Sequence, residues 1–186
     1  MDFISQQNFS QADAIEISKA DYDQCVFENC NFESQDLSYF RFSECEFVEC
    51  DFSNATLGGA VFQDLLFKNC KMIGLNFENL NRFNISFRFE DCVLNHSSFY
   101  QLDIRKTIFK NCRLEEVDFT ESNLLNVVFD HSDLRHSVFE QTNLELTDFR
   151  TALHFSVNPN QNHLKKTKFS KHNLEGLLTT FNIKIE

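Results

Sequence analysis

The chain has 186 residues, with 28 Asp and Glu against 17 Lys and Arg and a formal net charge of −11. This acidic balance argues against direct binding to nucleic acid, which needs a basic surface. Only 4 glycines and 1 proline are present. These are too few for the turns of a conventional β-sandwich, so the turns must be built into a repeated unit.

The chain begins MDFISQQNFS, which has neither the basic start nor the apolar core of a signal peptide. We therefore expect a cytoplasmic protein with no membrane segment. Residues 1–14 precede the repeats described next, and we expect them to form an N-terminal cap.

A repeat of five residues runs through the middle of the chain. Apolar side chains recur at every fifth position from Tyr22 to Phe77, and again from Phe89 to Phe149 after the frame slips by two residues within 80–86. This period fits neither the 3.6 of a helix nor the 2 of a strand, so it indicates an internal-repeat architecture. We expect one repeat domain over residues 15–152, with a bulge near 80–86.

All 7 cysteines occupy one position of the repeat, two residues before the central apolar residue. Elsewhere Ala, Ser, Thr and Val fill this position, which is typical of a small buried side chain. The C-x4-C spacing is not that of a zinc site, and an odd number of cysteines does not suit a disulfide framework. We expect core packing, with no metal and no cofactor.

Stretches such as ATLGGAVF, SNLLNVVF and TNLELTDF resemble the pentapeptide-repeat family. The resemblance implies an all-β fold, a right-handed quadrilateral parallel β-helix in which four pentapeptides make one coil. It also implies that the central residue and the residue two before it point inward, while the other three positions face solvent. Stacked coils then bury a core of central phenylalanines.

Charge is distributed unevenly along this expected rod. Residues 1–153 carry 26 of the 28 acidic residues but only 12 of the 17 basic ones. If one bulged repeat absorbs the frame slip, one face comprises 35–39, 55–59, 75–79, 97–101, 117–121 and 137–141. This face has no Lys or Arg, and its acidic residues are Asp36, Glu78, Asp118, Glu121 and Glu140. Such a surface either keeps the protein soluble or presents carboxylates, as a DNA mimic, to a partner that binds phosphate.

The break at 80–86, within LNRFNISF, interrupts the repeat between these two frames. It is either a short projecting loop or a bulge that restores the register of the ladder, and we favour the bulge. Asn81, Arg82 and Asn84 are the exposed candidates for a contact with a partner at this break.

Residues 153–186 form a C-terminal extension that contains a helical pattern. Leu174, Leu177, Leu178 and Phe181 recur at i, i+3, i+4 and i+7, which predicts one apolar stripe on a short α-helix, with Ser170 as a candidate N-cap. A helix this short needs a surface to pack on. It either caps the last coil or packs on a second copy.

The ending LEGLLTTFNIKIE resembles the Qnr/MfpA-like quinolone-resistance branch of the pentapeptide-repeat family. That resemblance implies a homodimer joined through the tail, and a type II topoisomerase (DNA gyrase or topoisomerase IV) as partner. Several proteins of this branch carry longer loops that contribute to quinolone protection, and this chain has only the break at 80–86. We therefore expect topoisomerase binding, whereas protection from fluoroquinolones does not follow.

Nothing in the sequence indicates catalysis. The six histidines fall at outward repeat positions or in or near the tail, and no nucleophile, phosphate-binding loop or carboxylate pair is evident. We expect a non-enzymatic protein. The competing hypothesis is a scaffold or regulator that binds another protein, since a fold does not determine its partner.

Overall fold

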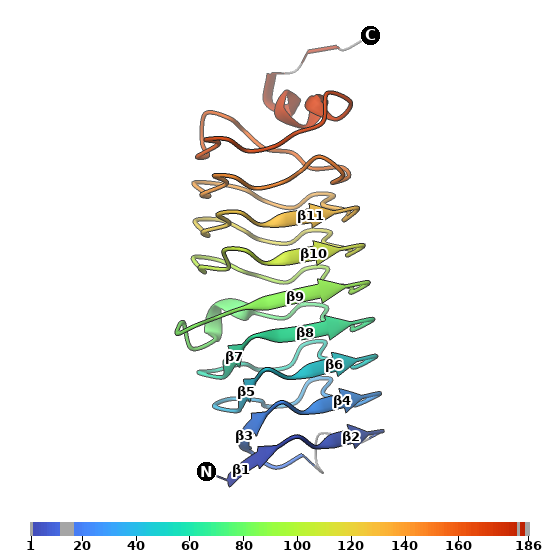
Figure 1. Cartoon of the computed structure of the whole chain (residues 1–186). Coiled ribbons are helices and arrows are strands. Elements are labelled where there is room, and N and C mark those ends of the chain that lie inside the picture. Colours follow the sequence, from blue (N-terminus) through green and yellow to red (C-terminus); the bar gives the residue numbers. More distant parts are fainter. Residues whose placement is uncertain (1, 12–16, 182, 185–186) are drawn as a thin grey trace.

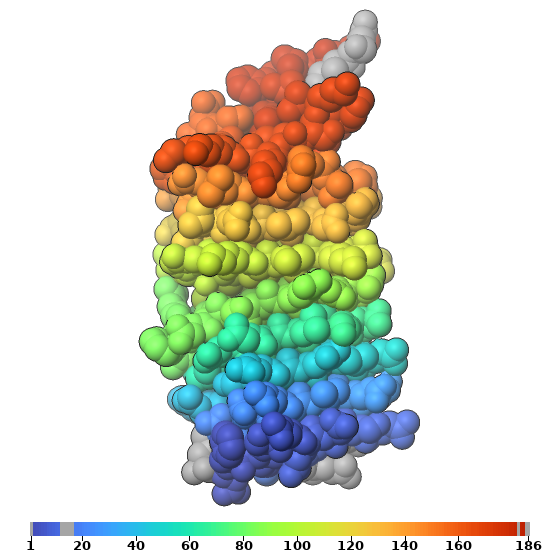
Figure 2. All heavy atoms as spheres, in the orientation of Figure 1, coloured from blue at the N-terminus to red at the C-terminus, as the bar shows by residue number. Residues whose placement is uncertain are grey.

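The computed structural model describes residues 2–11, 17–181 and 183–184. The chain winds into a rod, with β1 (Asp2–Ser5) at one end and the C-terminal segments at the other (Figures 1 and 2). The further strands are β2 (Asn8–Ser10), β3 (Ala20–Asp23), β4 (Val26–Glu28), β5 (Arg41–Ser43), β6 (Glu46–Val48), β7 (Val61–Gln63), β8 (Leu65–Lys68), β9 (Phe87–Glu90), β10 (Ile108–Lys110) and β11 (Val128–Asp130). Three 3₁₀ helices are η2 (Phe77–Asn79), η3 (Leu174–Leu177) and η4 (Thr179–Phe181).

Every pair of strands is parallel, and the partners lie one coil apart in the sequence. Phe27 pairs with Phe47, and Phe109 pairs with Phe129. The strands form a four-stranded sheet, β1-β3-β5-β7, and a seven-stranded sheet, β11-β10-β9-β8-β6-β4-β2. Isolated bridges on the remaining faces keep the same offset, as between Asn123 and Asn143. Four pentapeptides therefore complete one coil, and the expected all-β parallel solenoid is confirmed.

The ladder also extends beyond residues 15–152. In the segment expected to be a cap, β1 and β2 pair in parallel with β3 and β4. At the other end, bridges join Asn143 to His163 and Asp148 to Lys168. Of the expected cap, residues 1 and 12–14 lie outside the described residues.

The corners of the coil explain how a chain so poor in glycine turns so often. The residue two after nearly every central position has a left-handed backbone, for example Asn69 (φ 53°), Asn111 (φ 53°) and Asn126 (φ 61°). This region is open to Asn, Asp and His at a small cost, and Gly59 (φ 66°) uses it freely. Just before the central residue, a side chain such as that of Asp51 accepts a hydrogen bond from the Ser53 N–H at 2.8 Å. This Asx turn stabilises the bend locally.

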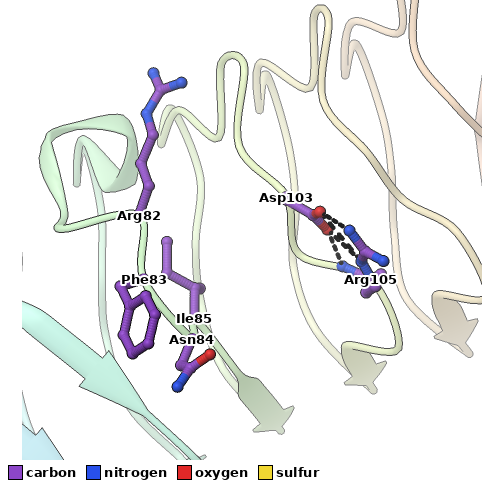
Figure 3. A pocket seen from close by; sticks show the side chains of 6 residues that line it. All are labelled: Arg82, Phe83, Asn84, Ile85, Asp103 and Arg105. Atoms are coloured by element: carbon purple, nitrogen blue, oxygen red, sulfur yellow. Dashed lines mark hydrogen bonds and ion pairs between the residues drawn. The ribbon is translucent and has the colours of Figure 1, made fainter.

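The break at 80–86 re-registers the ladder as expected, because β8 pairs with β9 at an offset that puts Leu65 opposite Phe87. It is not a bulge inside a strand, however. Residues 81–86 form a short exposed loop beside η2, and the four-stranded sheet ends at β7 (Figure 3). Of the two alternatives, the described segment has the form of a short loop. Two additional residues leave the sheet instead of distorting it, and Phe83 is 71% exposed at the loop.

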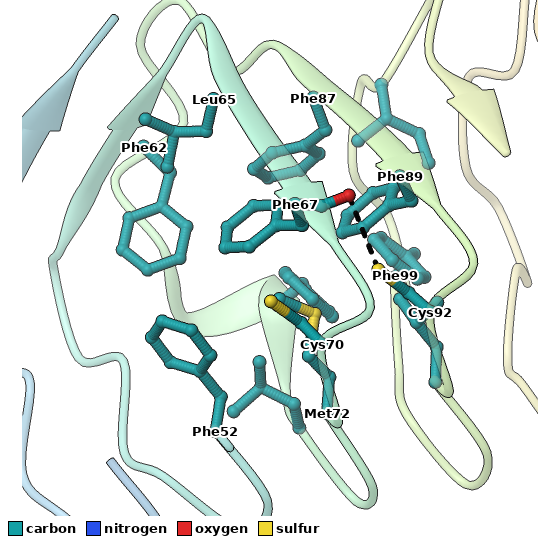
Figure 4. Close-up of a cluster of buried hydrophobic side chains, with 14 of the residues drawn as sticks. Phe52, Phe62, Leu65, Phe67, Cys70, Met72, Phe87, Phe89, Cys92 and Phe99 are labelled. Atoms are coloured by element: carbon teal, nitrogen blue, oxygen red, sulfur yellow. Dashed lines mark hydrogen bonds between the residues drawn. The ribbon is translucent and has the colours of Figure 1, made fainter. Parts of the chain in front are cut away.

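The core is a column of aromatic rings enclosed by the coils (Figure 4). Phe47 and Phe67 stack at 5.1 Å between ring centroids, and Phe89 and Phe109 also stack at 5.1 Å. Neighbouring faces contribute rings at right angles, so that Phe119 meets Phe129 edge to face. Such pairs stabilise by about 0.5–1.5 kcal/mol beyond their burial. The expectation that central phenylalanines stack coil upon coil is confirmed.

All seven cysteines are buried and lie outside any disulfide, as core packing predicts. Cys70 and Cys92 donate Sγ hydrogen bonds of 3.4 Å to the carbonyl oxygens of Phe47 and Phe67 in the preceding coil. Burial raises the pKa of Cys45 to about 12. That thiol therefore stays protonated at neutral pH, where it acts as a weak donor to the backbone.

The C-terminal segment differs from the expected α-helix. Residues 174–181 form the two 3₁₀ helices η3 and η4, and the residue before η3 is Asn173, not Ser170. η3 closes against the rod, because the Val157 N–H donates to the Gly176 carbonyl oxygen at 2.9 Å. A Cβ at Gly176 would lie 2.4 Å from the Phe155 ring. This close approach to the rod is the physical reason for glycine there and favours short turns over a straight helix.

Candidate functional site

The six segments predicted to share one face do so. Bridges join Asp36 to Thr56, Asn76 to Ser98, Ser98 to Asp118 and Asp118 to Val138. The Gly59 N–H donates to the Asn79 carbonyl oxygen at 2.8 Å and connects the second segment to the third. We call residues 35–39, 55–59, 75–79, 97–101, 117–121 and 137–141 the acidic face.

Asp118, Glu121 and Glu140 come together toward the C-terminal end of this face. Asp118 is held by an Asx turn, in which its Oδ1 accepts the Thr120 N–H at 2.8 Å. Glu121 and Glu140 lie on adjacent coils, since the Glu121 N–H donates to the Glu140 carbonyl oxygen at 2.8 Å. The Glu121 carboxylate accepts one hydrogen bond from Gln101 Nε2, also at 2.8 Å. Three of the five acidic residues therefore belong to two successive coils of this face.

Asp36 lies at the other end, four coils from Asp118, which is about 19 Å at the usual spacing of strands. Hydrogen bonds from Ser38, whose backbone N–H donates to Asp36 Oδ1 at 2.9 Å, lower the pKa of this carboxyl group. A cation that the repeat frame did not predict also lies near. Lys19 Nζ lies 4.5 Å from the centroid of the Tyr39 ring, and its charge further favours ionised Asp36. Lys19 precedes the repeat frame, so counting charges within the face missed it.

Glu78 does not fit the predicted role as well as the others. It lies in η2 and is half-buried, and its Oε2 is shielded from solvent without a hydrogen-bond partner. A carboxylate with one shielded oxygen presents less negative charge to a partner than an exposed one does. The 3₁₀ turn that precedes the break causes this burial, and the five-residue pattern gave no signal of it.

The distinguishing property of the acidic face is its lack of compensating cations. Among the described residues, its five acidic side chains form no ion pair with Lys or Arg, whereas nine such pairs occur on the rest of the rod. These pairs are Arg41–Asp21, Lys68–Glu46, Lys71–Asp51, Arg88–Glu90, Arg105–Asp103, Arg135–Asp133, Arg150–Asp148, Lys165–Glu145 and Lys168–Asp148. At one edge, His96 Nδ1 lies 3.2 Å from Glu116 Oε2. Exposed acids such as Glu28 and Glu49 also occur elsewhere, so acidity alone does not define the face.

The three loop candidates lie together just before β9, on the face that β7 occupies in the coil before. Asn81, Arg82 and Asn84 are all exposed, and Asn81 Oδ1 accepts the Phe83 N–H at 3.0 Å. The sequence analysis passed over Phe83, the most exposed apolar side chain of this loop, at 71%. The frame slip itself was the available signal, because a phenylalanine out of register with the inward positions has no place in the core.

The four tail residues divide into two groups. Leu177 packs against the core of the rod, and Leu178 is half-buried. Leu174 and Phe181 remain 43% and 52% exposed. One part of the predicted stripe therefore closes the last coil, and the other part leaves apolar surface at the end of the rod.

No geometry for catalysis or metal binding is seen in residues 2–11, 17–181 and 183–184. No three His, Cys, Asp or Glu side chains converge there as metal ligands. The same residues include no helix with the length and hydropathy needed to cross a bilayer. What the acidic face can do chemically is attract and bind cationic groups.

The chain was compared with known proteins at the levels of sequence and structure. A family model described as a pentapeptide repeat region matches residues 20–99 and 86–179. A trypsin-treated variant of QnrB1, a plasmid-mediated fluoroquinolone resistance protein, superposes with a TM-score of 0.71 at 15% identity, covering 100% of this chain and 92% of that chain.

Full-length QnrB1 superposes with a TM-score of 0.50 at 14% identity, covering 97% of this chain and 100% of the other. HetL from the cyanobacterium Nostoc, involved in heterocyst differentiation regulation, gives a TM-score of 0.45 at 13% identity, covering 89% and 86% of the two chains. No curated protein matches the chain. At these identities the two QnrB1 structures share the fold with this chain. The family model covers most of the sequence. The chain belongs to the pentapeptide-repeat family.

Proposed function

We propose that this protein is a non-enzymatic DNA mimic that binds a type II topoisomerase, DNA gyrase or topoisomerase IV, through its acidic face. The observation that carries the proposal is a face running along the rod on which no carboxylate is neutralised by Lys or Arg in the described chain. A topoisomerase must hold duplex DNA in a basic surface, and a rod of fixed carboxylates can occupy that surface instead.

The cluster of Asp118, Glu121 and Glu140 supplies the main attraction. These carboxylates are attached to a rigid ladder and need no reordering when the partner approaches, which lowers the entropic cost of binding. Their field steers a basic partner over a distance limited by salt screening, about 8 Å at physiological ionic strength. We place Asp36 at the distal edge of the contact, and we give Glu78 a minor part because of its burial.

The tail sets the length of the mimic. We propose that the exposed side chains of Leu174 and Phe181 pair with those of a second copy, so that two rods form a symmetric homodimer. Leu177 meanwhile anchors the tail to its own rod. A two-fold junction uses the same surface on both copies, and it doubles the length of acidic surface offered to the partner.

Protection from fluoroquinolones is a separate question from binding. QnrB1 is a plasmid-mediated fluoroquinolone resistance protein. In this chain the candidates for a contact that protects the enzyme from the drug are the loop residues Asn81, Arg82 and Asn84. The loop is short, and it directly follows residues 75–79 of the acidic face, at the neighbouring corner of the coil. We propose cytoplasmic modulation of the topoisomerase as the general function, with drug protection as one form that it can take.

A supercoiling assay with purified gyrase, with and without a fluoroquinolone, tests the function. Inhibition alone supports a DNA mimic, and restored activity under drug supports protection. The double variant Asp118→Asn/Glu121→Gln should weaken either effect, because it removes two charges and keeps the hydrogen bonds. Glu28→Gln/Glu49→Gln, which removes two exposed acids elsewhere, should change nothing.

Absence of any effect on gyrase and topoisomerase IV would contradict the proposal. It would leave the second hypothesis, a scaffold or regulator that uses the acidic face toward another basic protein. Equal loss in both double variants would instead show that total charge matters and that the acidic face has no special part.

A further inference from the structure

The loop at 81–86 leaves one rung of the β-ladder missing. In the two preceding coils, the amide at this corner donates to the next coil, from Gln24 to the Ser43 carbonyl oxygen and from Glu44 to the Gln63 carbonyl oxygen, both at 3.0 Å. The equivalent amide of Asp64 has no such partner among the described residues. Phe62 is fully buried, yet within the same residues its N–H and C=O also make no bond to a following coil.

The other side of the gap has the same defect. Asn123 and Asn143 donate their N–H groups to Leu102 and Ser122 of the coil before them, at 2.8 and 3.0 Å. In the described chain, the N–H of Asp103, one coil earlier, finds no carbonyl oxygen to accept it. Hydrogen bonds tie the loop to the rod where it leaves and returns, from Asn81 N–H to the Ala60 carbonyl oxygen and from Leu65 N–H to the Ser86 carbonyl oxygen, and Ile85 packs against the core.

Two hollows occupy the place of the missing rung. One, of about 390 Å³, lies between loop residues 82–85 and the pair Asp103 and Arg105 (Figure 3). The other, of about 410 Å³, is lined by Gln63 and Asp64 from one coil, by the loop residues Asn84, Ile85 and Ser86, and by Arg105 and Lys106 from the coil beyond the loop. Between the two coils that flank the gap, this corner therefore holds the loop, with Ile85 packed against the core, and open space beside it.

The charge at the gap differs from that of the rest of the rod. Arg82 and Lys106 form no ion pair with any described residue. Arg105 is held by the Asp103 carboxylate, with Nε at 2.9 Å from Oδ1. Backbone donors and acceptors without partners can bind a ligand that is itself an extended peptide. The two cations without ion pairs, Arg82 and Lys106, favour a peptide that carries carboxylates.

We propose that this slot, between β7 and residues 103–106, accepts one extended segment of a partner protein as an added parallel strand. The guest takes hydrogen bonds from the Phe62, Asp64 and Asp103 N–H groups, and its outward acidic side chains meet Arg82 and Lys106. A guest of a few residues matches the three-residue strands of this face, such as β5 and β7. This binding is independent of the acidic face and of the topoisomerase.

The probe is a blocked pentapeptide, Val-Glu-Val-Glu-Val, titrated into the full chain labelled with ¹⁵N. We expect shifts of the Phe62, Asp64 and Asp103 amide signals, and slower exchange of these amides with deuterated water. The same peptide with methylated backbone nitrogens should bind much more weakly, because it cannot pair as a strand. Arg82→Glu/Lys106→Glu should weaken binding roughly tenfold. Lys110→Glu/Arg113→Glu, which reverses two unpaired cations on other faces, should have no effect.

Three results would overturn the proposal. Unchanged amide signals at millimolar peptide would show that the slot takes no strand. Equal binding of a Val-Lys-Val-Lys-Val peptide would show that the cations do not select the guest. Strong exchange protection of Phe62 and Asp103 in the free protein would show that the loop itself closes the gap.

Discussion

The acidic face and the seven-stranded face are built from the same repeat on the same core, yet their outward charges are arranged in opposite ways. Asp118 and Asp148 make the comparison residue by residue. Each lies just before an inward phenylalanine, and each accepts an Asx-turn hydrogen bond, from Thr120 N–H at 2.8 Å and from Arg150 N–H at 3.1 Å.

The two carboxylates differ in what lies around them. Asp148 binds the Arg150 guanidinium, at 2.7 Å from Nη2, and has Lys168 Nζ at 3.9 Å, whereas Asp118 has no cationic partner in the described chain. At both sites the fold requires a side-chain oxygen that accepts the hydrogen bond of the turn. It does not require a Lys or Arg beside that oxygen. Function is therefore expected where the counter-charge is absent.

The largest expected effect tests whether the core is common to both faces. Phe119, under the acidic face, is fully buried and stacks on Phe99 and Phe139 at 5.3 and 5.1 Å between centroids. Phe119→Ala should reduce the free energy of unfolding by about 3–5 kcal/mol, through lost burial and a residual cavity. Phe129→Ala, under the seven-stranded face, should cost the same within a factor of two in urea denaturation. A much smaller cost on one face would mean that the two faces do not share one core.

A second prediction concerns the tail, through which we propose that two rods pair. Phe181→Ser should leave the unfolding free energy nearly unchanged and convert dimers to monomers in light scattering, because this side chain is half exposed. Leu177→Ser should instead cost about 1–3 kcal/mol locally, since Leu177 packs on the rod. Dimers that survive Phe181→Ser/Leu174→Ser would place the junction elsewhere.

The fold was predictable because the inward positions obey one rule in every repeat. Tyr22, Phe47 and Phe119 are equivalent in the sequence and are all buried. The two-residue slip was enough to place Asp36 and Asp118 on one face. The exposed loop, the burial of Glu78 and the position of Lys19 were not predictable in this way, because each lies at or beyond an interruption of the repeat. At such interruptions the local packing of the chain determines the structure, and the five-residue period does not.

The tail shows the same limit. Its spacing fitted an α-helix, and Leu177 does face the rod. The contact of Gly176 with Phe155 is a tertiary one that no periodicity encodes, and it is associated with two 3₁₀ turns. The pattern therefore located the contact residues but not the helix type.

A smaller effect tests the comparison itself. Asp148→Asn should destabilise the chain by about 1 kcal/mol, because it removes charge from a carboxylate whose side chain is only 12% exposed and is bound by Arg150. Asp118→Asn keeps its turn acceptor, loses no ion pair and should change stability by less than about 0.5 kcal/mol. Urea denaturation of the two variants at neutral pH measures both. Similar costs would mean that the counter-charge on the seven-stranded face adds nothing to stability.

The last prediction is that acid removes this difference. The hydrogen bond from Arg150 is the main cause that lowers the pKa of Asp148 from its ordinary value of 3.8. A carboxyl group whose pKa is lower in the folded state stabilises the fold above its unfolded pKa, and that contribution is lost as the pH falls through the folded value. The cost of Asp148→Asn should therefore be complete at pH 7, decline below about pH 4 and vanish in stronger acid. Denaturation curves of wild type and variant at several pH values would show it. A cost that persists unchanged in acid would mean that Asp148 acts through its turn hydrogen bond and not through its charge.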